Sequence, residues 1–186
     1  SAACSDGTPY CLVSYWKFDE GSGNTAFDSS TNKNTGTLIG PSWVGGMSGK
    51  ALIFDGANDY IKVLDSTFLN PDYITIEAWI RPASEKLSVQ NNGIIVEKID
   101  WANKRGYFLR WENDTDRMVF YVGNGTQWKS VSSSTDSVPV NRWSYVAVTF
   151  NGENLRVYIN GVLNQTAQHS GKIISNTNNL TIGAES

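Results

Sequence analysis

The amino-acid sequence predicts an all-β domain, an antiparallel jelly-roll sandwich in which two sheets pack face to face. One reason is the composition: 7 Trp, 8 Tyr and 7 Phe accompany 17 Gly and many Asn, Ser and Thr, which favours strands joined by tight turns. A second reason is that short apolar segments alternate with turn signals, while no segment longer than about ten residues keeps a helical period. With 186 residues, the chain is long enough to bury a full core as one domain.

Strand-like segments recur from residue 13 onward, and no linker interrupts them. The expected strands span residues 13–18, 51–54, 60–64, 74–80, 93–98, 106–111, 118–122, 128–131, 143–150, 155–159 and 179–182. Many short antiparallel strands of this kind indicate a sandwich or jelly roll.

The clearest hairpin signal lies in the stretch FNGENLRVYINGVLNQ, residues 150–165. Leu155, Val157 and Ile159 alternate with other side chains at the two-residue period of a half-buried strand. An Asn-Gly pair stands on each side of this strand, and an Asn-Gly step readily adopts the positive φ angles of a type I′ turn. We therefore expect a hairpin here.

Two segments are apolar on both faces, as strands covered from both sides are. The core-facing set in 74–80 is either the isoleucine set or the set with Trp79, and in 143–150 it is either the valine set or the set with Trp143. In 74–80 the isoleucine set is Ile74, Ile76, Ala78 and Ile80. In 143–150 the valine set is Val146, Val148 and Phe150, and the alternative set is Trp143, Tyr145, Ala147 and Thr149. We expect these segments to be the central core strands, with Trp79 and Trp143 committed to them.

The charge distribution argues against two classes of partner. The net charge is -3, and no basic block is present that would attract a phosphate backbone or an anionic lipid surface. No run approaches the ~20 apolar residues of a membrane span. We therefore expect neither nucleic-acid binding nor membrane insertion.

The only cysteines, Cys4 and Cys11, flank a Ser-Asp-Gly-Thr-Pro-Tyr segment that can turn back on itself. A local disulfide in a secreted protein is the favoured interpretation. Free thiols in a cytosolic protein and a lipid anchor on Cys4 are the alternatives. We accordingly divide the chain into an N-terminal segment, 1–12, and a β domain, 13–186.

Motifs in a fixed order resemble a known family. They are YWKFDEGSGNTAFDSS at 15–30, GKALIFDGANDYIKV at 49–63, ITIEAWIRP at 74–82, NRWSYVAVTFNGENLRVYINGVL at 141–163 and LTIGA at 180–184. These motifs resemble laminin-G-like domains of the concanavalin A-like lectin/glucanase superfamily. The resemblance implies a jelly roll used for carbohydrate binding, adhesion or as an accessory module of secreted enzymes, with glycosidases in some branches.

The resemblance also implies a closing C-terminal strand that would lie beside segment 13–18, after the motif at 180–184. The sequence ends at Ser186, so we expect this strand to be absent. Truncation of the sequence is the first explanation, and a family match that fails at this end is an alternative. The third explanation is that the open strand edge accepts a strand from a neighbouring subunit.

The residues give little support to catalysis. The best carboxylate group is Glu112, Asp114 and Asp116 in WENDTDR, which a polar hairpin loop explains, and Glu77 and Glu97 are isolated acids within strands. The one histidine, His169, is expected to be a solvated loop residue. We therefore expect a protein that is not an enzyme.

Calcium is more plausible than catalysis, because hard cations choose carboxylate, amide and carbonyl oxygens gathered from loops. The resembled family often carries one calcium ion. The candidate ligands are Asp19, Asp28, Asn34, Asp55 and Asp59. Asp and Asn also cap turns, which is the alternative explanation for them.

A sugar site needs an exposed aromatic face beside polar side chains. Trp101 lies in the polar loop KIDWANKRG, and Trp111 and Trp128 also stand beside loop residues. The candidate sugar contacts are Trp101, Asn103, Arg105, Trp111 and Trp128; the alternative is that these rings cover the edges of the sandwich. Asn-x-Ser/Thr sequons mark Asn113, Asn124, Asn164 and Asn179 as candidate glycosylation sites.

The function that we expect is a non-catalytic carbohydrate-binding or adhesion module, secreted or at the cell surface, with a glycan or cell-surface protein as partner. The second interpretation is a structural subunit of a cell-surface assembly or filament. A glycosidase or lyase is the third.

Overall fold

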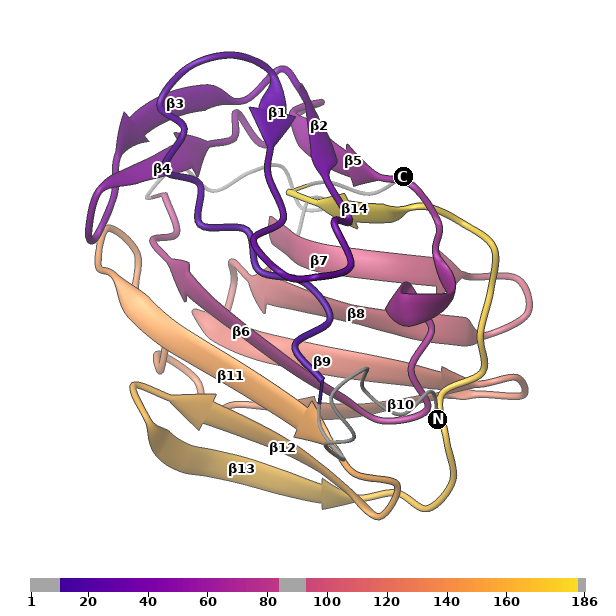
Figure 1. Ribbon diagram of the computed structural model, residues 1–186. Helices are drawn as coiled ribbons and strands as arrows, with labels where there is room; N and C mark the ends of the chain where they lie inside the picture. Colours follow the sequence, from indigo (N-terminus) through magenta and orange to yellow (C-terminus); the bar gives the residue numbers. More distant parts are fainter. Residues whose placement is uncertain (1–10, 84–92, 184–186) are drawn as a thin grey trace.

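The computed structural model describes residues 11–83 and 93–183, and these residues form a β-sandwich (Figure 1). The only helical element in these ranges is the short 3-10 turn η1 (Thr67–Leu69). The strands are β1 (Thr25–Ala26), β2 (Gly36–Ile39), β3 (Ser42–Gly45), β4 (Lys50–Ile53), β5 (Tyr60–Val63), β6 (Ile74–Ile80), β7 (Gly93–Asp100), β8 (Arg105–Glu112), β9 (Arg117–Asn124), β10 (Trp128–Ser132), β11 (Ser144–Phe150), β12 (Asn154–Ile159), β13 (Val162–Gln168) and β14 (Leu180–Ile182). The prediction of an all-β sandwich of two packed sheets is confirmed, and β3 and β4 form a separate two-stranded sheet.

The larger sheet has eight strands in the order β1-β2-β5-β14-β7-β8-β9-β10. Strand β14 comes last in the chain, yet it pairs antiparallel with β5 on one side and β7 on the other. This insertion joins the early strands to the β7–β10 meander. Folding of the large sheet therefore depends on contacts between the two ends of the sequence.

The smaller sheet has four strands in the order β13-β12-β11-β6 and faces the larger one (Figure 1). Strands β12 and β13 are joined at Asn160 and Gly161, whose φ angles of 51° and 81° are those of a type I′ turn. The predicted hairpin is confirmed at this Asn-Gly pair. At the other pair, the Asn151 side-chain oxygen accepts backbone N–H bonds from Glu153 and Asn154 and so caps a different turn.

The core lies between the two sheets. The small sheet contributes Ile74, Ile76, Ala78 and Ile80 of β6 and Val146, Val148 and Phe150 of β11. The isoleucine alternative therefore holds for β6, and the valine alternative holds for β11. From the large sheet it takes Tyr107, Leu109 and Trp111 of β8 and Met118, Phe120 and Val122 of β9. Every second residue of each strand therefore points inward, as the period of a strand requires.

The prediction that Trp79 and Trp143 are core residues is wrong. Trp79 is 50% exposed on the outer face of β6, where it packs against Tyr145 with ring centroids 5.4 Å apart. Trp143 precedes β11 and is only partly buried. Strand β6 pairs with β11 on one side, and the described residues contain no strand on its other side. It is thus an edge strand of its sheet rather than a central one.

Segment 13–18 is not a strand but makes one isolated bridge, between Trp16 and Asp28. Val13, Trp16 and Phe18 still pack against the core, which explains the strand-like apolar pattern. The predicted acceptance of a strand from a neighbouring subunit stays a prediction. So does the Cys4–Cys11 disulfide, because Cys4 lies outside the described residues.

Candidate functional site

The β7–β8 hairpin presents Trp101 at its tip. The turn closes when the Lys104 backbone N–H donates to the Trp101 carbonyl, at 3.3 Å, and Lys104 takes a left-handed φ of 51°. The Trp101 side chain is 62% exposed. A large apolar ring is therefore held in solvent by a closed turn.

Trp101 does not project freely, because it lies on an aromatic cluster on the outer face of the large sheet. Its ring stacks on Trp128 of β10 at a centroid distance of 5.4 Å and an interplanar angle of 28°. Phe108 of β8 lies under both rings and is only 3% exposed. Phe108 in turn stacks on Tyr121 of β9 at 4.3 Å. We call Trp101, Phe108, Tyr121 and Trp128 the aromatic cluster.

The sheet register explains the cluster. Phe108 pairs directly with Tyr121, and Trp128 pairs with Gly123, so all these positions face outward. Gly123 lets the hairpin approach, since a Cβ atom there would clash with the Lys104 carbonyl. The Gly125 backbone N–H donates to that same carbonyl at 2.9 Å, which ties the β9–β10 turn to the β7–β8 hairpin.

Charged groups border the aromatic cluster. The Arg110 guanidinium lies over the Tyr121 ring, 5.1 Å from its centroid, and donates to Glu112 Oε1 at 2.8 Å. Arg117 donates to Glu112 Oε2 at 2.7 Å. Glu112 is thus engaged by two arginines, which agrees with the interpretation of WENDTDR as a structural hairpin rather than a catalytic pair.

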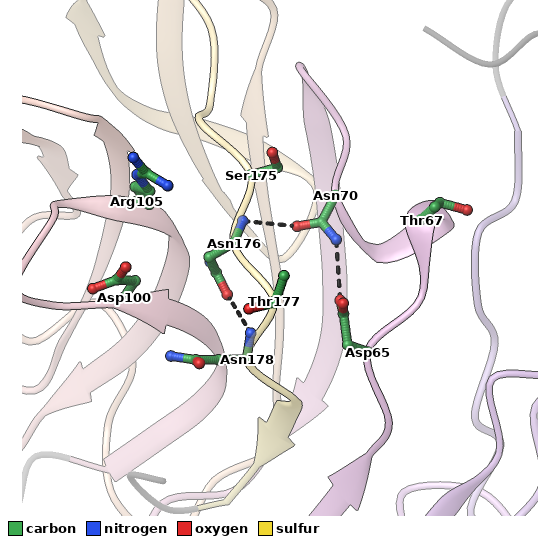
Figure 2. Close-up of a pocket in the computed structure, with 9 residues that line it drawn as sticks. All are labelled: Asp65, Thr67, Asn70, Asp100, Arg105, Ser175, Asn176, Thr177 and Asn178. Carbon is green, nitrogen blue, oxygen red and sulfur yellow. Dashed lines mark hydrogen bonds between the residues drawn. The ribbon is translucent and has the colours of Figure 1, made fainter.

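A polar cleft of about 480 Å³ lies at the end of the sandwich that carries this hairpin (Figure 2). Segment 175–178 runs through it between the hairpin and the η1 region. The lining residues are Asp65, Thr67, Asn70, Asp100, Arg105, Ser175, Asn176, Thr177 and Asn178. Asp100 and Arg105 are cross-strand partners at the base of the turn that presents Trp101. The same hairpin therefore contributes to the aromatic cluster and to the cleft.

Buried Lys98 joins the segments that form the cleft. Its side chain is 0% exposed, and its Nζ lies 2.7 Å from Asp65 Oδ1. The same ammonium donates to the carbonyls of Asn178 and Asn176 at 2.6 and 3.1 Å. Asn176 returns a bond from its Nδ2 to the Lys98 carbonyl. Such charge-assisted bonds fix the positions of loops that would otherwise be independent.

Asp100 is ionised at neutral pH. Hydrogen bonds from the Asn103 side chain and then from its backbone lower the pKa of Asp100; burial opposes them, and the positive charge of Arg105 adds a smaller lowering. The buried Tyr107 hydroxyl donates to the Leu69 carbonyl at 3.1 Å. Complete burial, followed by the charge of Asp65, raises the Tyr107 pKa far above its ordinary value, so this hydroxyl stays protonated.

The structure separates the predicted sugar contacts. Trp101 and Trp128 come together in the aromatic cluster, and Arg105 lines the cleft, while Asn103 binds Asp100 from within the turn. Trp111 is a correction: it is 5% exposed in the core and donates its indole N–H to the Val138 carbonyl at 3.0 Å. It pairs with Gly93 and Met118 on the inward side, so its ring cannot reach a ligand.

Sequence reasoning did not find Phe108 and Tyr121 of the cluster, or Asp65 and the asparagines of the cleft. For the two aromatic residues a signal existed, since they occupy the positions of their strands that alternate with the core residues. The cleft residues come from segments far apart in the sequence, and no local pattern marks them.

The calcium candidates lie in different places. Asp28 is 3% exposed, and its carboxylate accepts 2.8 Å bonds from the backbone of Tyr15, Ser30 and Asn34 and from the Ser30 hydroxyl. These bonds fill the lone-pair positions that a cation would need. Asp28 therefore has a structural role, and Asn34 shares it because its backbone N–H is one of the donors to Asp28.

The remaining candidates accept backbone hydrogen bonds in two other turns. Asp19 accepts the Lys50 backbone N–H, and Asp55 and Asp59 form their own turn through the Asp55 backbone N–H. No group of three or more His, Cys, Asp or Glu side chains in the described ranges could hold a metal ion. Calcium binding stays a prediction.

His169 is another correction, because it is a buried residue rather than a solvated one. Its ring stacks on Phe150 at 5.5 Å, and its backbone N–H donates to the Glu153 carbonyl. Burial, and then the nearby charge of Lys129, lower its pKa. The side chain therefore packs at the edge of the sandwich in its neutral form.

The sequons occupy partly exposed positions. Three of the asparagines accept backbone N–H bonds through their side-chain oxygen: Asn124 from Thr126, Asn164 from Ser134 and Asn179 from Asp65. Asn113 lies in the β8–β9 turn. Glycosylation at these positions stays a prediction.

A family model described as the concanavalin A-like lectin/glucanases superfamily matches residues 55–186, more than half of the chain. The chain belongs to this superfamily. The laminin-G-like resemblance and the jelly-roll prediction are therefore confirmed. A search of curated proteins gave no match. No helix in the described part of the chain is long and apolar enough to span a membrane.

Solved structures share the fold at low sequence identity. Domain 4 of AbnA, a GH43 extracellular arabinanase from Geobacillus stearothermophilus, solved in complex with arabinotriose, is 18% identical and gives a TM-score of 0.66 over 92% of this chain and 82% of that one. The W1238A mutant of HCR/D is 16% identical and gives a TM-score of 0.65 over 85% of this chain. This chain spans only 41% of the length of that protein. At these identities the likeness establishes the fold.

Proposed function

We propose that this domain is a non-catalytic carbohydrate-binding module of an extracellular or cell-surface protein. The observation that carries the proposal is the exposed Trp101 ring, stacked on Trp128 at the tip of a closed hairpin. A sugar ring has an apolar face of C–H groups, and a flat indole that is already held in place can pack against it without a large loss of side-chain freedom.

Polar groups for the sugar hydroxyls stand on the same hairpin and beside it. Arg105 and Asp100 lie at its base, and the cleft adds the hydroxyls of Thr67, Ser175 and Thr177. Apolar stacking combined with a few placed hydrogen-bonding groups is the usual chemistry of small-molecule recognition. The fold of AbnA domain 4, solved with arabinotriose, supports a glycan as ligand.

A glycan array with the purified domain tests the proposal, run with and without a calcium chelator. We expect binding to a defined set of oligosaccharides, and at least tenfold weaker binding by Trp101→Ala. The matched control is Trp79→Ala, because Trp79 is also exposed, at 50%, but lies on the opposite sheet. Binding that survives Trp101→Ala, or no binding to any glycan, would reject the proposal. Loss of binding on chelation would show that calcium takes part.

A second candidate is a structural subunit of a cell-surface assembly. The observation that favours it is the edge of β6, which has no strand beside it within the described residues. Unpaired backbone groups on such an edge can accept a strand from another chain. Light scattering across a concentration series distinguishes the two functions. Self-association of the wild type that is abolished by a proline in β6, such as Thr75→Pro, would favour assembly. A protein that stays monomeric at every concentration would oppose it.

A further inference from the structure

The cleft beside Trp101 contains one cation whose side chain makes no hydrogen bond with the described residues. Lys98 beneath the cleft is committed, because it is fully buried and bound to Asp65 and to two carbonyls. Asp65 also accepts a bond from Asn70 at 3.1 Å. These contacts neutralise the Lys98 and Asp65 charges within the protein.

Both carboxylate oxygens of Asp100 also accept hydrogen bonds within the protein. Its Oδ1 accepts the Asn103 backbone N–H at 3.1 Å, and its Oδ2 accepts the Asn103 Nδ2 at 2.8 Å. Arg105 is its cross-strand neighbour and its charge acts on Asp100, yet the Arg105 side chain makes no hydrogen bond or close ion pair with any described residue. Its guanidinium keeps all five N–H donors for a ligand.

The position of Arg105 suits it to ligand recognition. It lines the cleft, and it begins the strand that follows the Trp101 turn. The strands of a hairpin lie only about 4.8 Å apart, so a ligand two or three sugars long can contact both sides of this one. Lys104, in the same turn, adds a second positive charge against the one negative charge of Asp100.

The remaining lining favours a polyhydroxylated ligand. The hydroxyls of Thr67, Ser175 and Thr177 line the cleft and have no hydrogen-bond partner among the described residues. The volume of about 480 Å³ suits a ligand of one or two sugar rings. The cleft therefore offers one free guanidinium surrounded by groups that bind hydroxyls.

We propose that the ligand is an acidic glycan, whose uronate carboxylate pairs with Arg105 in the cleft while a neighbouring sugar ring packs on Trp101. The planar guanidinium matches a carboxylate through two parallel N–H···O bonds, which a neutral sugar cannot form. This inference rests on the proposed carbohydrate-binding function and specifies its ligand class.

The test compares acidic trisaccharides with neutral counterparts of the same shape. The probes are the trimers of galacturonic, glucuronic and mannuronic acid, each beside its carboxyl-reduced form, measured by calorimetry. We expect at least one acidic trimer to bind about tenfold or more tighter than its reduced form. Arg105→Gln should weaken binding of the acidic trimer far more than binding of the reduced form and so remove this preference, and Arg105→Lys should restore only part of it.

The control variants separate this inference from the function on which it rests. Arg142→Gln removes another exposed arginine, outside the cleft, and should keep the preference. Trp101→Ala should weaken acidic and reduced forms alike. Three results would overturn the acidic-ligand inference alone. The wild type could bind both forms equally, the preference could survive Arg105→Gln, or the protein could bind neutral glycans through Trp101 and bind no uronate. If Trp101→Ala binds the trimers as tightly as the wild type does, the proposed site itself is overturned.

Discussion

The indole rings of Trp101 and Trp128 stack with their centroids 5.4 Å apart, although they come from a hairpin turn and from the edge strand β10. Phe108 is sealed beneath them. The contact holds the Trp101 ring in one orientation while most of its surface stays in water. A ring ordered in this way binds a sugar face at a lower entropic cost than a free side chain would.

Trp101→Ala should separate binding from stability. Aromatic pairs contribute about 0.5–1.5 kcal/mol each beyond burial, and the Trp101 ring is mostly exposed, so we expect a loss of about 1 kcal/mol in the free energy of unfolding. Urea denaturation measures this loss, and calorimetry with an array-selected glycan measures binding. A stability loss as large as that of a core truncation would mean that Trp101 is a structural residue.

Trp111→Ala should destabilise the domain strongly. The ring is buried in the core and donates its N–H to Val138, so truncation leaves a cavity and an unpaired carbonyl. We expect a loss of about 3–5 kcal/mol, measured by urea denaturation. Trp143→Ala, at a partly exposed position before β11, should cost clearly less. Equal costs for the two variants would contradict the assignment of Trp111 to the core.

Lys98→Met should destabilise the end of the sandwich that forms the cleft. The variant removes a buried ammonium and leaves Asp65 and two carbonyls without their partner. Breaking a buried pair on one side costs about 3 kcal/mol or more. The matched control is Lys62→Met, because Lys62 is exposed on strand β5 of the same sheet. If both variants unfold at the same urea concentration, Lys98 does not join the cleft segments as described.

Asp28 should make stability depend on acid pH. Burial is the largest single influence and raises its pKa, but the bonds from Tyr15, Ser30 and Asn34 together lower the pKa below 3.8. Because the folded-state pKa lies below the unfolded value, the stabilisation is fully present above about pH 4 and is lost as the pH falls through the folded-state pKa. Asp28→Asn should therefore lower stability at pH 7, by about 2 kcal/mol.

Melting temperatures of wild type and Asp28→Asn between pH 7 and pH 2 check this dependence. The difference between the two proteins should be constant down to about pH 4 and should shrink below it. A difference that grows on acidification would have the wrong sign for a carboxylate with a lowered pKa.

Local periodicity was sufficient to predict the strands whose partners are close in sequence. The β12–β13 turn follows from Asn160 and Gly161, whose positive φ angles a strand pair needs. Strand β6 also has a clear two-residue period, but its partner β11 is distant in the sequence, and the period alone left open whether the isoleucines or Trp79 face inward. Strands β2 and β13 were each missed for a different reason. The first has only four residues and is stabilised by pairing with β5, and the second carries the polar sequence VLNQTAQ.

The site was predicted only in part because its formation depends on register. Trp111 and Trp128 both stand beside loops, yet strand parity turns one ring into the core and the other outward. The sequence alone does not show which parity holds. The cleft depends on β14 entering the large sheet, which brings Asn176 and Asn178 to Lys98. Contacts over such long separations leave no local pattern.

The most direct measurement of the central claim is a nitrogen–proton NMR spectrum of the seven tryptophan indole groups, recorded during titration with the array-selected glycan. The Trp101→Ala and Trp79→Ala variants assign the two decisive signals. We predict that the Trp101 and Trp128 signals shift together with one binding curve, while the signals of Trp79 and Trp111 stay in place. If the glycan shifts the Trp79 signal and leaves the Trp101 and Trp128 signals unchanged, the result would contradict glycan binding at the aromatic cluster.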